Sequence, residues 1–153
     1  MEVKIIDGRE HLDEVKEIIL EYTKFLERDL SFQNFDEEIS DLEKKYLPPG
    51  GRLLCAEIDG KIIGCVAYHK HNSERCEMKR LFVRENYREH HAEKKLVEEI
   101  LKFAKADGFK EIVLDTITPL KSAIALYKKF GFVETEPYYS NPMSDVIYMK
   151  KIL

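Results

Sequence analysis

The sequence of 153 residues lacks tryptophan and is poor in the residues that mark unusual classes of protein. Its 3 cysteines, 5 prolines and 7 glycines are too few for a disulfide scaffold or for a collagen-like or low-complexity chain. Apolar residues make up 44% and charged residues 35%, a balance typical of a folded globular chain. The length is that of one ordinary domain, so we expect residues 1–153 to form a single domain.

The sequence also lacks the segments that direct a chain into or across a membrane. No apolar run is long enough to span a bilayer, and no charged and then apolar leader follows Met1. The odd number of cysteines in such a chain favours reduced thiols, and Cys55, Cys65 and Cys76 are expected in the core of the protein. We therefore expect a cytoplasmic protein with no membrane partner.

An excess of positive charge is absent as well. The formal net charge is −4, and the 25 basic and 29 acidic residues are mixed along the chain. Nucleic-acid-binding modules normally present a dominant basic face, so no nucleic-acid partner is expected.

The spacing of apolar residues predicts the order of helices and strands. A period of three to four residues predicts helices over residues 12–26, 35–46 and 92–107 and from 118 to before 131. Short apolar runs predict strands at residues 3–6, 52–58, 61–70, 76–83, 111–116, 132–135 and 146–150. This order is typical of an α/β (α+β) fold, in which helices cover both faces of a mixed sheet.

Local signals sharpen three of these boundaries. Asn34, with Glu37 three residues later, predicts a capping box at the start of the second helix. The Asp59-Gly60 pair between two apolar runs predicts a tight hairpin. Thr118 as the N-cap and Pro119 at the first helical position predict the start of the last helix.

Two motifs resemble the Gcn5-related N-acetyltransferase (GNAT) superfamily. Residues 81–93 read LFVRENYREHHAE, where that family usually has LxVxPxYRGxGxG, and Leu81, Val83, Tyr87 and Arg88 match. The second family signature, AIxLYxxxGF, is complete at residues 123–132. The resemblance implies the GNAT fold, a mixed and mostly antiparallel sheet of about seven strands flanked by about four helices. It also implies acetyl-coenzyme A (acetyl-CoA) as cosubstrate.

The resemblance implies a cofactor site from the fourth strand into the following helix. A helix N-terminus attracts a pyrophosphate through its unpaired N–H groups and partial positive charge. In this reading, the backbone N–H of Leu81 binds the thioester oxygen. The candidate residues are Leu81, Phe82, Val83, Arg88, Glu89, His90, His91, Ala92, Glu93 and Lys94.

Glu89, His91 and Glu93 stand where the family usually has glycine. Side chains at these positions restrict a close approach of the backbone to phosphate, and the two carboxylates repel it. We therefore expect weaker cofactor binding than is usual in the family, or an altered cofactor.

The candidate catalytic residues are Glu77 and Tyr127. By resemblance, Glu77 is the general base, acting through an ordered water, and Tyr127 is the general acid that protonates the leaving thiolate. Strand periodicity predicts that Glu77 shares one face with Lys79, Leu81 and Val83. The alternatives are a surface carboxylate or a partner for Lys79, and a tyrosine that only packs in the core.

The expected acceptor site is the loop that holds Tyr138, Tyr139 and Asn141, although paired tyrosines also fit ordinary packing. His69 and His71 share a strand face and could bind a metal ion with Cys76 or His90. The spacing shows no set of four ligands, so no metal site is expected.

The sequence thus predicts an acyl-CoA-dependent N-acetyltransferase that acts on the amine of a small molecule or amino acid. The alternative is a non-catalytic GNAT-fold binding or regulatory module with weakened CoA binding. The oligomeric state stays open, a homodimer included.

Overall fold

The computed structural model, which describes residues 2–30 and 34–153, contains one seven-stranded sheet. The spatial order of the strands is β1-β2-β3-β4-β5-β7-β6. The strands are β1 (Lys4–Asp7), β2 (Gly51–Ile58), β3 (Lys61–Lys70), β4 (Arg75–Val83), β5 (Glu111–Ile117), β6 (Val133–Thr135) and β7 (Val146–Ile152). Neighbouring strands are antiparallel except for the parallel pair β4 and β5, which confirms the predicted mixed, mostly antiparallel sheet.

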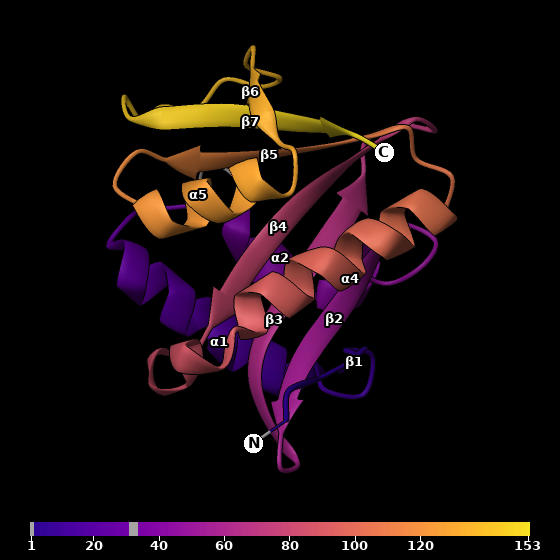
Figure 1. Ribbon diagram of the computed structural model, residues 1–153, viewed down its shortest axis with the longest axis vertical. Helices are drawn as coiled ribbons and strands as arrows, with labels where there is room; N and C mark the ends of the chain where they lie inside the picture. The colour runs from indigo at the N-terminus through magenta and orange to yellow at the C-terminus, as the bar shows by residue number, and fades with distance from the viewer. Residues whose placement is uncertain (1, 31–33) are drawn as a thin grey trace.

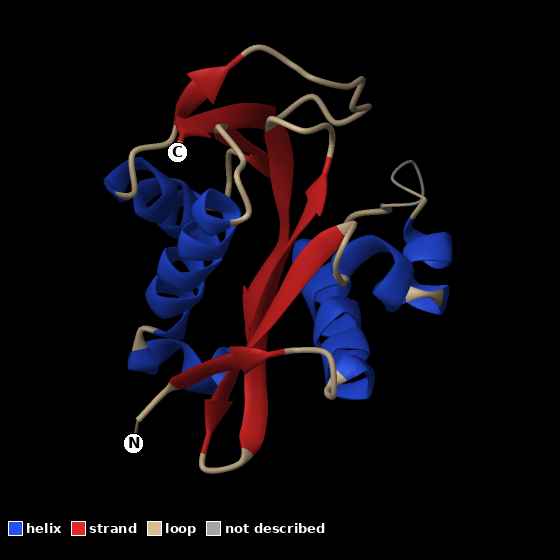
Figure 2. Ribbon diagram, turned by 90° about the vertical axis from the view of Figure 1, so that its right-hand side faces the viewer, coloured by secondary structure: helices blue, strands red, loops and turns tan. Residues whose placement is uncertain are grey.

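Helices cover both faces of this sheet, as predicted (Figures 1 and 2). One face carries α4 and α5, and the other carries α1, α2 and α3 (Figure 2). The helices are α1 (Leu12–Leu26), α2 (Phe35–Ser40), α3 (Leu42–Tyr46), α4 (Ala92–Ala106) and α5 (Lys121–Lys129), with a 3₁₀ helix, η2 (Glu85–His90), before α4.

The hydrophobic core has two layers because each face of the sheet is covered. Under α4, the core contains Leu96 and Ile100 together with apolar residues of the central strands. Under α1, it contains Ile18, Ile19 and strand residues of the opposite face. Cys55, Cys65 and Cys76 are buried and form no disulfide, as expected for core residues.

The predicted second helix is two short helices. Asp41 leaves helical geometry, with φ −151° and ψ 76°, and its carboxylate accepts the N–H of Lys44 at 3.3 Å as the cap of α3. The helix therefore breaks at Asp41, because an aspartate at this position caps a new helix start. The predicted capping box at Asn34 was also wrong: Asn34 is left-handed, with φ 57°, and makes no side-chain cap hydrogen bond.

The predicted start of the last helix was wrong by two residues. The N–H of Thr118 donates to the carbonyl of Asp145 at 3.0 Å, which ties the chain to the segment before β7. Leu120 then caps α5, and the helix begins at Lys121. By contrast, the hairpin at Asp59-Gly60 is confirmed, since both residues have positive φ, 49° and 80°. Within residues 2–30 and 34–153, no helix is long and apolar enough to cross a membrane.

Candidate active site

The sheet opens between its two central parallel strands. β5 pairs only with the first residues of β4, from Arg75 to Glu77, and the two strands then diverge (Figure 1). Leu81–Val83 lie beyond this pairing, so their edge faces a gap between the strands, which we call the β4–β5 opening. An unpaired strand edge offers main-chain donors and acceptors to an extended ligand.

A bulge at Arg80 shapes this opening. Arg80 has φ 62°, and the register between β3 and β4 shifts at this level. The bulge reverses the alternation of side chains. Leu81 and Val83 consequently pack in the core under α4, whereas Glu77 lies opposite, next to His69. The prediction that Glu77, Leu81 and Val83 share one face was therefore wrong.

Glu77 is buried, and its carboxylate accepts hydrogen bonds from three side chains. Its Oε1 lies 2.9 Å from Nε2 of His69 and 3.0 Å from Nε2 of His71, and its Oε2 accepts the hydroxyl of Tyr138 at 2.7 Å. Lys79 Nζ is 3.9 Å from Oε2. Only 4% of Glu77 is exposed, so the alternative of a surface carboxylate is wrong. The alternative of a partner for Lys79 holds, in addition to the contacts with both imidazoles.

These contacts determine the charge states in the cluster. Burial would raise the pKa of Glu77, but the hydrogen bonds from His69 and His71, together with Lys79 and Tyr138, hold this pKa far below its ordinary range. Burial lowers the pKa of His69, so its imidazole is neutral at neutral pH. Burial also lowers the pKa of Lys79, to about 8. The cluster therefore combines an ionised carboxylate with at least one neutral imidazole.

Tyr127 lies on α5, in the core under α4, with its ring 5.8 Å from that of Phe132. Burial raises the pKa of the Tyr127 phenol. The hydroxyl therefore stays protonated well above neutral pH, as a general acid must be before the thiolate forms. The packing alternative describes the ring correctly and leaves the role of the hydroxyl untested.

The predicted phosphate site lies at the start of α4. His91 precedes this helix with φ 56° and makes no side-chain cap hydrogen bond. Ala92 is buried, Glu93 is half-buried and Lys94 is exposed. The side chains of Glu89 and His90 lie outside the described residues. A left-handed residue at position 91 is a conformation that glycine adopts without strain and histidine adopts at some cost.

Arg88 lies against the side of the opening. Its Nε donates to the carbonyl of Val83 at 3.2 Å, and its guanidinium lies 4.6 Å from the ring centroid of Phe25 and 5.1 Å from that of Phe82. The positive charge is thus held beside the end of β4, where η2 leads into α4.

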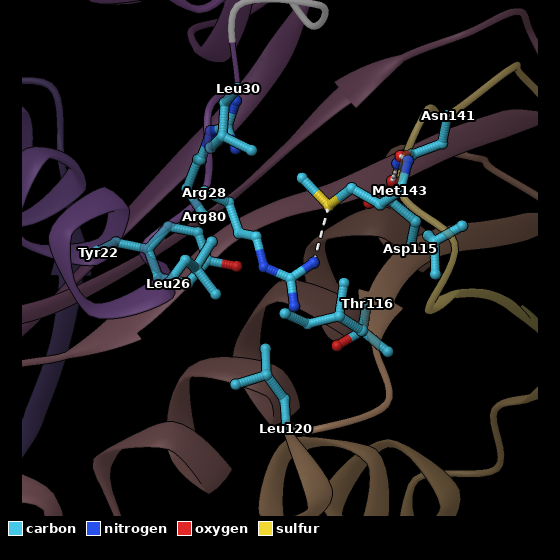
Figure 3. Close-up of a pocket in the computed structure, with 12 residues that line it drawn as sticks. Tyr22, Leu26, Arg28, Leu30, Arg80, Asp115, Thr116, Leu120, Asn141 and Met143 are labelled. Atoms are coloured by element: carbon cyan, nitrogen blue, oxygen red, sulfur yellow. Dashed lines mark hydrogen bonds between the residues drawn. The ribbon is translucent and has the colours of Figure 1, made fainter.

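A pocket lies beside the opening on the α1 face, and we call it the α1–β5 pocket (Figure 3). The guanidinium of Arg28 points into it, and its Nη1 lies 3.5 Å from the sulfur of Met143 (Figure 3). It is lined by Tyr22, Leu26, Arg28, Leu30, Arg80, Asp115, Thr116, Ile117, Leu120, Asn141, Met143 and Val146.

The predicted acceptor loop reaches both this pocket and Glu77. Asn141 lines the pocket and donates to the hydroxyl of Tyr139 at 2.8 Å. The hydroxyl of Tyr139 donates to Asp115, whereas Tyr138 bonds Glu77. The structure therefore places Tyr138 on Glu77, and Tyr139 and Asn141 on Asp115, with the rings of the two tyrosines 5.4 Å apart.

Sequence analysis missed several charged groups around the pocket. Arg28 forms a bidentate ion pair with Asp145, at 2.9 and 2.8 Å, across 117 positions. Asp115 could not be recognised as a site residue from the sequence, because it lies within an apolar run that predicts a buried strand. Of the two partners considered for the histidines, Cys76 packs in the opposite core and Glu77 lies beside them instead, whereas the side chain of His90 lies outside the described residues.

Comparison with known proteins gives a consistent family assignment. The model of the acetyltransferase (GNAT) family matches residues 12–132. An uncharacterized N-acetyltransferase of Schizosaccharomyces pombe is 43% identical over 141 residues, covering 91% of this chain and 86% of the relative. The N-acetylaspartate synthetase of Xenopus tropicalis is 33% identical over 97 residues, covering 62% of this chain and 36% of that protein.

Solved structures show the same fold. An acetyltransferase from Streptococcus agalactiae superposes with a TM-score of 0.81 at 24% identity, covering 99% of this chain and 98% of the other. A GNAT family acetyltransferase from Elizabethkingia anophelis with acetyl-CoA bound has a TM-score of 0.61 at 26% identity, over 74% of this chain and 82% of the other.

Proposed function

The chain belongs to the acetyltransferase (GNAT) family, and we propose that it transfers the acetyl group of acetyl-CoA to the amine of a small molecule or amino acid. An N-acetyltransferase must deprotonate the amine, stabilise the tetrahedral oxyanion and protonate the leaving thiolate. The observation that carries the proposal is the β4–β5 opening, because a buried carboxylate with two imidazoles lies at its base and a helix N-terminus lies at its far end.

The main-chain groups along this opening can bind acetyl-CoA at three points, namely the pantetheine arm, the thioester oxygen and the pyrophosphate. The main chain of Leu81–Val83 can pair with the amide groups of the pantetheine arm, and the N–H of Leu81 can bind the thioester oxygen. The first turn of α4 presents N–H groups to the pyrophosphate. The acetyl-CoA bound to a structural relative supports this choice of cosubstrate.

Glu77 and the imidazoles bonded to it would accept the proton of the amine through an ordered water. A carboxylate with a strongly lowered pKa is a weak base by itself. A neutral imidazole beside that carboxylate is a better acceptor, because the negative charge of Glu77 stabilises the imidazolium that forms. Tyr127 would then protonate the leaving thiolate, whose conjugate acid has a pKa of about 8.5.

The charges of the α1–β5 pocket favour an acceptor that carries both an amine and an acid group. Asp115 contributes a carboxylate, and Arg28 contributes a guanidinium that Asp145 binds, whereas the guanidinium of Arg80 is bound by Glu38. A substrate carboxylate would displace Asp145 from Arg28, because a guanidinium matches a carboxylate in geometry and charge, and Asp115 would attract the ammonium group. A relative over part of the chain is named N-acetylaspartate synthetase, which supports an amino-acid acceptor.

A thiol-release assay tests the proposal. The purified chain is incubated with acetyl-CoA and a panel of amino acids and simple amines, and free CoA is measured with a thiol reagent. We expect turnover above the hydrolysis background with at least one amino acid. Calorimetric titration with acetyl-CoA provides the second measurement: binding without turnover across the panel would favour the non-catalytic module, and no binding would reject both readings.

A further inference from the structure

Three metal-ligand atoms converge at the edge of the active site. One ring nitrogen of His69, one of His71 and a carboxylate oxygen of Glu77 all lie within 4.8 Å of one another. His69 is the cross-strand partner of Glu77 in the antiparallel ladder of β3 and β4, so their closeness is fixed by the sheet. Among the residues that the structure describes, this is the one set of three such side chains that meets in this way.

We propose that His69, His71 and Glu77 bind a zinc ion. Two imidazole nitrogens and one carboxylate oxygen form the ligand set of an open tetrahedral zinc site, in which water takes the fourth position. Zinc bonds of about 2.0–2.2 Å at tetrahedral angles separate neighbouring ligand atoms by about 3.3 Å. Oε1 of Glu77 already lies 2.9 and 3.0 Å from the two nitrogens, so small shifts of the side chains admit the ion.

Binding replaces two hydrogen bonds with three metal–ligand bonds. Without the ion, each imidazole donates Nε2–H to Oε1 of Glu77. With the ion, the proton of each neutral ring sits on Nδ1, and the lone pair of Nε2 binds the metal. Each imidazole therefore keeps one proton and stays neutral when the ion binds.

The surroundings of Glu77 suit a metal ligand. The hydroxyl of Tyr138 donates to Oε2 at 2.7 Å and orients the carboxylate through the oxygen that does not face the histidines. The side chains of His69 and His71 are each 22% exposed, which gives an ion access from solvent. The three cysteines are buried and cannot compete for zinc in the folded protein.

Lys79 opposes the bound ion. Its Nζ lies 3.9 Å from Oε2 of Glu77, so its positive charge would face a second cation across the carboxylate. This repulsion limits the affinity of the site. A Lys79→Met variant is therefore expected to bind zinc more tightly than the wild-type protein.

Zinc at this position would inhibit acetyl transfer, a consequence that rests on the proposed function. With the ion on Nε2, Nδ1 of each neutral ring carries the proton and Glu77 binds the metal, so neither imidazole keeps a lone pair that could receive the proton of the acceptor amine. Its binding, by contrast, needs neither acetyl-CoA nor an acceptor.

The test is a competition titration of the metal-free protein with Zn²⁺ against a chromogenic chelator, in the absence of acetyl-CoA. We expect one ion per chain, no competition from Mg²⁺, which prefers six oxygen ligands, and weaker binding by His71→Ala and Glu77→Gln. Tyr138→Phe should lower the affinity by about 10- to 100-fold, as for partners that orient a ligand. His11→Ala is the matched control, because His11 bonds Glu14 outside the cluster.

Equal zinc affinity in His71→Ala and the wild-type protein would overturn the site, and so would the absence of stoichiometric binding. The side chain of His71 is 22% exposed and lies beyond the end of β3, so its loss should leave the fold intact, and circular dichroism checks this. Zinc binding without any acetyl transfer would leave the site standing and reject the proposed function. Turnover without zinc binding would reject the zinc site and leave the proposed function standing.

Discussion

Nε of Arg80 donates to Oε2 of Glu38 at 2.8 Å, which fastens the bulge of β4 to α2 across 42 positions of sequence. The side chains are 4% and 1% exposed. Lys45 approaches the other oxygen of Glu38 at 2.9 Å, and the guanidinium of Arg80 lies 5.4 Å from the ring of Phe35. The bulge that opens β4 away from β5 is thus held in place from the α1 face.

Glu38→Gln should destabilise the protein by roughly 3–5 kcal/mol, because it leaves a buried guanidinium without its partner charge. Urea denaturation followed by circular dichroism at pH 7 measures this loss. Glu37→Gln, one position earlier and exposed, is the control and should change little.

The same pair predicts an acid dependence. Burial would raise the pKa of Glu38, but Arg80 and Lys45 lower it from an ordinary 4.5 to about 2. A carboxylate whose pKa is lowered by folding stabilises the protein above its unfolded pKa, and the protein loses that stability as the pH falls toward the folded value. Stability should therefore drop between about pH 4.5 and 2 in the wild-type protein and less in Glu38→Gln. If both proteins lost the same stability between about pH 4.5 and 2, the role of this pair would be contradicted.

Glu77→Gln should lower kcat/KM near neutral pH by roughly 10²–10⁴-fold, the usual range for acid–base catalysis. The amide keeps the shape of the side chain but lacks the charge that stabilises an imidazolium on His69 or His71. Part of the loss should be recovered at high pH, where the amine is already deprotonated. Acetyl-CoA affinity should stay unchanged, as should the activity of the exposed control Glu74→Gln. A loss below about threefold would mean that another group takes the proton.

Tyr127→Phe should keep acetyl-CoA binding and reduce kcat more than KM, because the hydroxyl is needed only when charge develops on sulfur. The phenyl ring preserves the contact with Phe132 in the core, so the thermal midpoint should move little. Pre-steady-state measurement of CoA release isolates the chemical step. Wild-type kcat under those conditions would remove Tyr127 from the mechanism.

Replacing His91 and Glu93 with glycine should tighten acetyl-CoA binding. Glycine adopts the left-handed backbone at position 91 without strain, and the loss of Glu93 removes a carboxylate that repels phosphate. Calorimetry measures the affinity. The double alanine variant separates the two effects, because it removes the carboxylate and keeps a Cβ in the left-handed conformation. Unchanged or weaker binding by the glycine variant would reject this account of the loop.

The sequence by itself determined the order of the elements, since periods of two and of three to four residues depend only on neighbouring positions. β3 was predicted with its observed bounds, Lys61–Lys70, and the start of α4 at Ala92 was also correct. The signature at residues 123–132 and the partial phosphate motif indicated the family, which the family model confirms. Local sequence was sufficient for these features because short-range geometry fixes them.

Only the tertiary structure decided which side chains meet. Periodicity placed Glu77 with Leu81 and Val83, but the bulge at Arg80 reversed the alternation, and a single left-handed residue in a strand leaves no pattern in the sequence. The pairing of Glu38 with Arg80 and the placement of His69 and His71 on Glu77 depend on strand register and on a helix that packs across the sheet. Contacts between distant residues follow from this packing, so the chemistry of the site was visible only once the chain was folded.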